Sequence, residues 1–303
     1  MSMRILFMGT PNFARESLDA LYKAGHDICA VMTRSDKPKN RGMHLTPPPV
    51  KELALAHGTP VYQPKTLRDG EALALIQDLS PDLIVVVAYA KILPQEILDL
   101  PPYGCINVHP SLLPKYRGAA PIQCAVLNGE ETTGVTIMQM DAGLDTGDII
   151  TQREADILPD ETSGELFERL CVVGAELLVE TIQMIASRTA TYMPQDSNLS
   201  SYAKPITRDM SPVNWTRTAF EITNQIRGLN PWPTATATIK DRDFKLLAAH
   251  PGTGEGAPGE VLQAGKSGLE IACGDGSVYI TKLQAPGKKT MSAADYLRGN
   301  PIE

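Results

Sequence analysis

The stretch LIVVVA at residues 83–88 decides the class of fold. All six of its residues are apolar, so the strand that they predict must be buried on both faces. Such a strand is typical of the centre of a parallel sheet that helices cover on both sides. The stretch therefore predicts an α/β protein, and it belongs to the core rather than to a functional site.

The segments on either side of this strand alternate in the same way. Residues 4–8 and 28–32 predict strands around a helical pattern at 11–24, and a second helical pattern at 71–79 precedes the central strand. Strand patterns follow at 135–140 and 149–153, and capping-box spacing from Thr162 to Glu165 predicts a long helix towards residue 187. We expect a mainly parallel sheet.

A second domain is predicted after a change in pattern. The periodicity fails over residues 189–206, where polar residues and two prolines are typical of a linker. A helical pattern at 220–227 is then followed by short strand-like segments at 234–239, 244–249, 259–264, 269–272 and 278–283. We therefore expect an α/β domain over 1–188, a linker over 189–206, and a small OB-like β-barrel over 207–303.

The composition is that of a soluble globular protein. Its 303 residues are 43% hydrophobic and 21% charged, and the five cysteines form no Cys-x-x-Cys pair. The longest apolar stretch is far too short to span a membrane, and no signal peptide is predicted. His26, His44, His57 and His250 stand alone, without a second ligand nearby. We expect a cytoplasmic monomer with no metal and no membrane contact.

The net charge of −7 is unevenly distributed. Residues 207–303 hold 11 basic and 10 acidic residues, so the acidity lies in the preceding part of the chain. Within that acidic part, residues 34–51 hold five basic residues and one acidic residue, Asp36. This basic segment is also rich in proline, which predicts an exposed flexible loop that could contact a nucleic acid.

Two polar side chains follow the central strand. Asn107 and His109 are two residues apart in a predicted strand, so they project from the same face, and Pro110 ends that strand. Ligands of open α/β sheets bind at the carboxyl ends of strands. From this spacing alone, a catalytic and a structural role for His109 remain equally open. Asp145 in the segment LDTGD could simply belong to a turn.

The first strand also ends in a glycine, at Gly9-Thr10-Pro11. A dinucleotide-binding fingerprint would need two further glycines, which let a pyrophosphate approach the start of the helix. Those glycines are missing, so a tight turn is the favoured interpretation.

Three motifs together carry a family resemblance. NVHPSLLP at 107–114, RGAAPIQ at 117–123 and GLDTGD at 143–148 resemble the formyltransferases that use 10-formyltetrahydrofolate. Segments at 8–11, 41–42, 47–51, 135–140, 230–233 and 287–289 extend the likeness over nearly the whole chain. The resemblance implies a Rossmann-like formyltransferase domain that uses the folate as co-substrate and needs no metal.

The resemblance also assigns roles to residues. It implies that Asn107 and His109 donate hydrogen bonds to the formyl oxygen, and that Asp145 favours the protonated form of His109 and accepts a proton. It places the folate against the loop formed by Ser111, Leu112, Leu113 and Pro114.

The acceptor implied is methionyl initiator tRNA, formylated on its α-amine for translation initiation. Contacts to the tRNA are expected from Arg41, Lys39 and Lys37 in the basic segment and from Lys288 and Lys289 in the barrel. One alternative is a formyltransferase for a nucleotide sugar or a small amine, which would share the folate motifs. A non-catalytic RNA-binding protein is the other, and the presence of Asn107, His109 and Asp145 speaks against it.

Overall fold

The computed structural model describes residues 2–39 and 44–302. The chain divides into two compact units. The first unit contains residues 1–118, 134–155 and 167–202, and the second contains residues 119–133, 156–166 and 203–303. Two short segments of the amino-terminal part of the chain therefore belong to the second unit.

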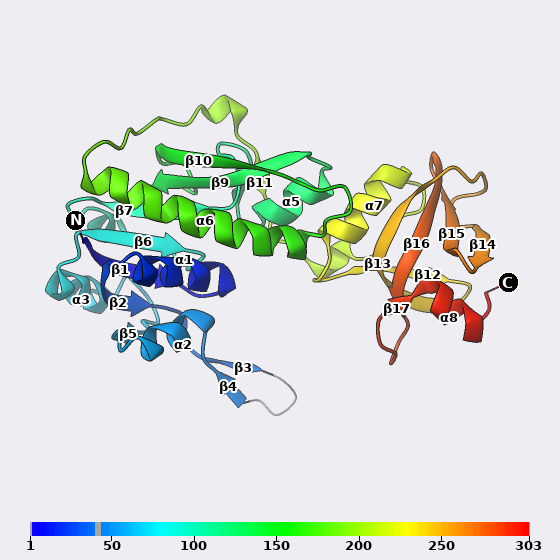
Figure 1. Ribbon diagram of the computed structural model, residues 1–303, viewed down its shortest axis with the longest axis horizontal. Helices are drawn as coiled ribbons and strands as arrows, with labels where there is room; N and C mark the ends of the chain where they lie inside the picture. The colour runs from blue at the N-terminus through cyan, green and yellow to red at the C-terminus, as the bar shows by residue number, and fades with distance from the viewer. Residues whose placement is uncertain (1, 40–43, 303) are drawn as a thin grey trace. The chain divides into compact units, whose positions relative to one another are not determined.

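A seven-stranded sheet forms the centre of the first unit, in the order β10-β9-β7-β6-β1-β2-β5 (Figure 1). Strands β5, β2, β1, β6 and β7 pair in parallel, and β7 pairs antiparallel with β9. Every residue of β6 is buried, as its sequence predicts. The strand bounds are β1 Arg4–Gly9, β2 Asp27–Met32, β5 Val61–Tyr62, β6 Leu83–Val87, β7 Cys105–His109, β9 Thr132–Gln139 and β10 Ile149–Asp156.

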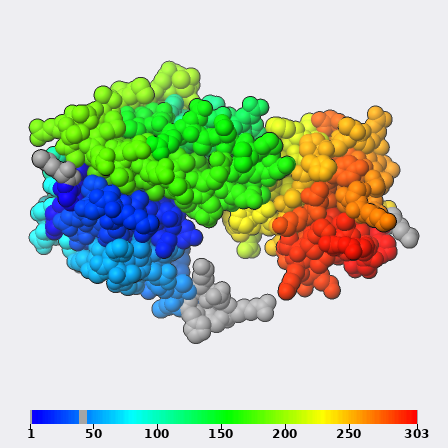
Figure 2. All heavy atoms as spheres, viewed as in Figure 1, coloured from blue at the N-terminus to red at the C-terminus, as the bar shows by residue number. Residues whose placement is uncertain are grey.

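Helices pack on both faces of this sheet. On one face, β1, β2 and β6 share a core with α3 (Glu71–Leu79) and α4 (Gln95–Leu98). On the other face, Phe13 of α1 (Asn12–Lys23) contacts Phe167 of α6 (Ser163–Ala186), and Gly174 of α6 lies against Val108 and Val135. From Phe167 onward, α6 forms a band of surface over the first unit, drawn in green in Figure 2.

The long helix α6 begins as the sequence predicts. Thr162 Oγ1 accepts a hydrogen bond from the backbone N–H of Glu165, and the Glu165 carboxylate accepts one from the N–H of Thr162. This reciprocal capping box satisfies two backbone donors that the helix leaves free at its start.

The second unit is built on an antiparallel sheet, in the order β12-β13-β16-β15-β14 with β17 paired to β16 (Figure 1). Its hydrophobic core is continuous with α7 and α8, and α7 begins with a second capping box between Thr218 and Glu221. The bounds are α5 Pro121–Leu127, α7 Ala219–Gly228, α8 Ala293–Gly299, β12 Ala235–Ile239, β13 Arg242–Gly252, β14 Val261–Gly265, β15 Gly268–Cys273, β16 Gly276–Gln284 and β17 Met291–Ser292.

The segment expected as a linker is fastened to the first unit over most of its length. Met193 exchanges two backbone hydrogen bonds with Ile149, and the Ser201 carbonyl oxygen accepts one from Arg117. Backbone groups make these contacts, which the polar composition of the segment does not reveal. The rest of the segment contains the short elements η1 Ser197–Leu199 and β11 Tyr202–Ala203.

Two short strands lie within the basic segment. β3 (Lys37–Lys39) pairs antiparallel with β4 (His44–Thr46), and the pair projects from the first unit in Figure 1. The helix α2 (Pro49–Ala56) follows, with proline in its first turn. The sequence did not predict these elements, because three-residue strands and a proline-rich start leave little periodicity.

Candidate active site

Strand β7 presents Asn107 and His109 at the carboxyl end of the parallel sheet. Asn107 lies beside Val86 of β6, and His109 lies beside Thr136 of β9. Cys105, Ile106 and Val108 are buried, whereas Asn107 is partly exposed. Within the described part of the chain, the Asn107 side chain makes no hydrogen bond, so its amide is free to donate one.

The His109 ring is held by a hydrogen bond at one nitrogen. Its Nε2 lies 2.9 Å from the carbonyl oxygen of Tyr116. A carbonyl oxygen only accepts, so Nε2 carries a proton and donates it. The other nitrogen, Nδ1, lies 3.8 Å from Asp145 Oδ2, too far for a direct hydrogen bond. In the neutral ring, Nδ1 therefore holds a lone pair on the side of Asp145.

The surroundings of His109 favour its neutral form. The side chain is almost fully buried, with 4% of the residue exposed, and this burial lowers its pKa. The Asp145 carboxylate and the Tyr116 carbonyl raise the pKa, but burial has the larger effect. The expected influence of Asp145 on His109 is present, yet it does not make the imidazole protonated near neutral pH in the free protein.

Asp145 occupies a strained position in a braced loop. Its φ of 54° lies in the left-handed region, which costs free energy for a residue other than glycine. The Oδ2 atom accepts a hydrogen bond of 2.8 Å from the Gly118 N–H. Within the same loop, Thr146 Oγ1 donates to the Asp141 carboxylate. The structure thus brings Asp145 next to His109.

The loop at 111–114 is held in place because each of its four carbonyl oxygens accepts a hydrogen bond. The Ser111 oxygen accepts from Thr136 Oγ1, the Leu112 oxygen from the N–H of Lys115, the Leu113 oxygen from Gln152 Nε2, and the Pro114 oxygen from the N–H of Ser201. Ser111 and Leu113 are buried, and the Ser111 hydroxyl donates to the Lys115 carbonyl. Leu112 and Pro114 are partly exposed, so a folate contact by this loop would be mainly apolar.

A second loop at the same edge was missed by sequence reasoning. Directly after β6, Ala88 and Ala90 have φ values of 45° and 56°. Between them Tyr89 is buried, and within the described residues its hydroxyl has no hydrogen-bond partner. Burial raises the pKa of Tyr89 to about 12, so the hydroxyl stays protonated. Strained residues beside an unpaired buried donor are typical of ligand-binding loops. The only signal for this loop was its position after β6, the strand next to β7 in the sheet.

The basic segment separates into structural and exposed residues. Arg34 donates to the Ala90 carbonyl, and Lys51 donates to Asp36 and to Gln63. Both are therefore used within the first unit. Lys37 is exposed on β3, whereas Lys39 is described only by its backbone.

Arg41, one of the expected tRNA contacts, lies outside the described residues. Lys288 and Lys289 are both exposed in the turn between β16 and β17.

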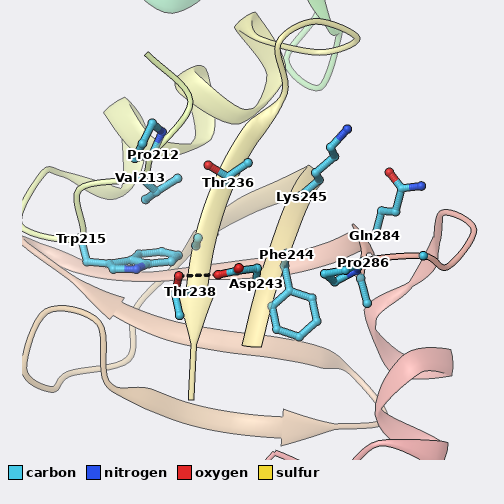
Figure 3. A pocket seen from close by; sticks show the side chains of 13 residues that line it. Pro212, Val213, Trp215, Thr236, Thr238, Asp243, Phe244, Lys245, Gln284 and Pro286 are labelled. Atoms are coloured by element: carbon cyan, nitrogen blue, oxygen red, sulfur yellow. Dashed lines mark hydrogen bonds between the residues drawn. The ribbon is translucent and has the colours of Figure 1, made fainter. Parts of the chain in front are cut away.

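A pocket of about 800 Å³ opens beside that turn, lined by residues of β12, β13 and the segment 284–287. Figure 3 shows the indole ring of Trp215 along one side and Phe244 and Pro286 on the other, with Lys245 pointing outward. Thr238 donates a hydrogen bond of 2.7 Å to Asp243 across its floor. Its size is in the range of small-ligand sites.

Neither a metal site nor a membrane span is found in the described part of the chain. Its His, Cys, Asp and Glu side chains form no group of three or more that could hold a metal ion. Among its helices, none is both long enough and apolar enough to cross a membrane.

Comparison with known proteins shows the family. A family model described as "Formyl transferase" matches residues 3–182, and one described as "Formyl transferase, C-terminal domain" matches residues 205–301. The chain belongs to the formyl transferase family, and it is an enzyme. The resemblance predicted from the motifs is confirmed.

Two relatives that match nearly the whole chain are both named methionyl-tRNA formyltransferase. The protein of that name from Pelotomaculum thermopropionicum is 48% identical over 303 residues, which cover 99% of this chain and 96% of the relative. The one from Moorella thermoacetica is 49% identical over 302 residues, which cover 99% and 97%.

Solved structures confirm the fold class. WlaRD, described as a sugar 3N-formyl transferase in the presence of dTDP and 5-N-formyl-THF, matches with a TM-score of 0.68 and 22% identity over 95% of this chain and 100% of its own. HypX from Aquifex aeolicus, in complex with tetrahydrofolic acid, matches with a TM-score of 0.66 and 18% identity over 98% of this chain and 47% of its own. At these identities the likeness shows the fold alone.

The burial of His109 predicts how stability depends on pH. Because its pKa is lower in the native state than in the unfolded chain, where it is about 6.5, the unfolded chain binds a proton that the native state does not. This contribution is fully present above that pH and is lost as the pH falls towards the native pKa. In His109→Gln, the free energy of unfolding should therefore decrease less than in the wild type between about pH 7.5 and about pH 5.5.

Chemical denaturation at the two pH values measures this difference. His250→Gln serves as the control, since His250 is exposed. An equal pH dependence in the wild type and in His109→Gln would contradict a buried neutral imidazole.

Proposed function

We propose that the chain transfers the formyl group of 10-formyltetrahydrofolate to the α-amine of methionyl initiator tRNA, in the cytoplasm. The observation that carries this proposal is the placing of Asn107, His109 and Asp145 at one sheet edge, in a chain 48% identical to a methionyl-tRNA formyltransferase over 99% of its length. A monomeric state stays a prediction.

The two donors act on the oxygen of the formyl group. When an amine attacks the formyl carbon, negative charge develops on that oxygen, and preorganised donors stabilise it. The partly exposed Asn107 amide supplies one N–H. His109 supplies the other through Nδ1, because its Nε2 proton is bound to the Tyr116 carbonyl. This donation requires a proton on Nδ1.

The attacking amine is the source of that proton. The lone pair of Nδ1 and the Asp145 carboxylate, 3.8 Å apart, form a pair that can accept one proton as the amine loses it. Asp145 then stabilises the imidazolium, and the pair can return the proton to the leaving nitrogen. One proton thus passes from the attacking amine to the His109–Asp145 pair and from this pair to the leaving nitrogen, and no covalent intermediate is formed with the enzyme.

The residues at the sheet edge fit a folate. Its polar ring needs fixed hydrogen-bond partners, and the unpaired Tyr89 hydroxyl together with the backbone of Ala88 and Ala90 offers them. Leu112 and Pro114 offer apolar wall. When bound, 10-formyltetrahydrofolate supplies the formyl group.

The proposal also names the molecule that receives the formyl group, the charged initiator tRNA. Lys37, Lys39 and Arg41 of the basic segment, and Lys288 and Lys289 in the turn between β16 and β17, would neutralise phosphates of the tRNA. A nucleotide sugar or a small amine remains the alternative acceptor, but the sugar-modifying relatives are only 22% identical and support the fold alone. The alternative therefore has the weaker support.

Formyl transfer to methionyl initiator tRNA tests the proposal. We expect Asn107→Ala and His109→Ala each to lower kcat about 100- to 1,000-fold, because each removes one donor to the developing oxyanion. The affinities for folate and tRNA should change little, since neither donor holds the ground state strongly. Gln77→Ala, an exposed change on α3, is the matched control.

Two outcomes would contradict the proposal. Unchanged turnover in either donor variant would end the catalytic assignment. Formylation of an amino sugar nucleotide, with no formylation of the charged initiator tRNA, would replace the acceptor.

The basic segment should bind the tRNA and not the folate. Replacing Arg41 by alanine should raise KM for the charged tRNA, because one phosphate contact is lost. For the same reason, this KM should rise less steeply with added salt in the variant than in the wild type. KM for the folate should stay constant. Lys65→Ala, at an exposed lysine outside the basic segment, is the control. A larger change in folate KM than in tRNA KM would overturn the assignment.

A further inference from the structure

The side chain of Gln195 connects a buried arginine to the loop that carries Asp145. Arg117 is 2% exposed, and its Nε and Nη2 donate to Gln195 Oε1 at 3.0 and 2.7 Å. On the other side, Gln195 Nε2 donates to the carbonyl oxygens of Asp145 and Gly147 at 2.9 and 2.7 Å. Both ends of the amide are therefore engaged.

Only one orientation of this amide satisfies its partners. A guanidinium only donates, and a carbonyl oxygen only accepts. The Gln195 oxygen must therefore face Arg117, and its nitrogen must face the Asp145 loop. A glutamate at this position would keep the bonds from Arg117 and lose both bonds to the loop.

The same short segment also contacts both reacting side chains. The carbonyl of Tyr116 binds His109 Nε2, and the N–H of Gly118 binds Asp145 Oδ2 at 2.8 Å. Arg117 stands between these two residues. Through Gln195, it also reaches the backbone of Asp145, which holds the left-handed φ of 54°.

We propose that Gln195, oriented by Arg117, is a positioning residue for formyl transfer, because it holds the Asp145 carboxylate at its place beside His109. This inference rests on the proposed function, in which Asp145 and His109 share the proton of the amine. Gln195 itself touches neither reacting atom, so its action passes through the backbone of the Asp145 loop.

A titration separates positioning from a merely structural role. The Asp145 carboxylate raises the pKa of His109, whereas burial lowers it. If loss of Gln195 lets Asp145 move away, the pKa of His109 should fall below its wild-type value. If the substitution only loosens the packing and admits water, that pKa should rise towards its ordinary value.

The experiment compares Gln195→Glu and Gln195→Met with Gln183→Met, an exposed glutamine on α6. With methionyl initiator tRNA and 10-formyltetrahydrofolate, kcat should fall about 10- to 100-fold in both Gln195 variants, because small misplacements of a catalytic group carry losses of that order. Both KM values should stay within about twofold. An NMR titration of His109 in Gln195→Met should show the lowered pKa.

Gln195→Glu keeps the test decisive if Gln195→Met folds poorly. It retains the acceptor for Arg117, so its thermal midpoint should stay near the wild-type value while kcat falls. A wild-type kcat in Gln195→Glu, or a raised pKa of His109 in Gln195→Met, would overturn the inference.

Asp145→Asn distinguishes this failure from that of the proposed function. If Asp145→Asn loses activity while Gln195→Glu keeps it, only the inference on Gln195 fails. If Asp145→Asn is fully active, the proton role of Asp145 fails, and the positioning role falls with it.

Discussion

The hydrogen bond from His109 Nε2 to the Tyr116 carbonyl decides what the site can do. It fixes the proton of the neutral imidazole on the nitrogen that faces the protein, and leaves Nδ1 as a base on the side of Asp145. Burial then keeps the ring neutral until a proton arrives. In the proposed mechanism, Nδ1 receives a proton from the attacking amine and then becomes a donor for the formyl oxygen.

The rest of the first unit keeps this arrangement in place. Strand β7, which carries Asn107 and His109, is mostly buried and lies beside the fully buried strand β6. The loop at 111–114, with all its carbonyls bound, returns the chain to Tyr116 in a fixed course. Opposite it, a strained Asp145 is held by Gly118 and Gln195. Rigid support of this kind suits catalysis by preorganised donors, which must not reorganise during the reaction.

Much of this could be predicted from the sequence, because the relevant patterns are local. The apolar stretch at 83–87, the spacing of Asn107 and His109, and the capping box at Thr162 each depend on a few neighbouring residues. Gln195 could not be found in this way. It lies 50 residues beyond Asp145 and acts on a backbone carbonyl, which no side-chain pattern records. Similarly, nothing in the residue type of Ala88 or Ala90 indicates a left-handed backbone.

The most direct test of the account is to determine which ring nitrogens of His109 carry a proton, by ¹⁵N NMR of the free enzyme near neutral pH. The account predicts a neutral ring with the proton on Nε2 and a bare Nδ1. A ring protonated on both nitrogens would contradict the role of burial, and a neutral ring with its proton on Nδ1 would contradict the bond to Tyr116. In either case Nδ1 could not accept the proton of the attacking amine.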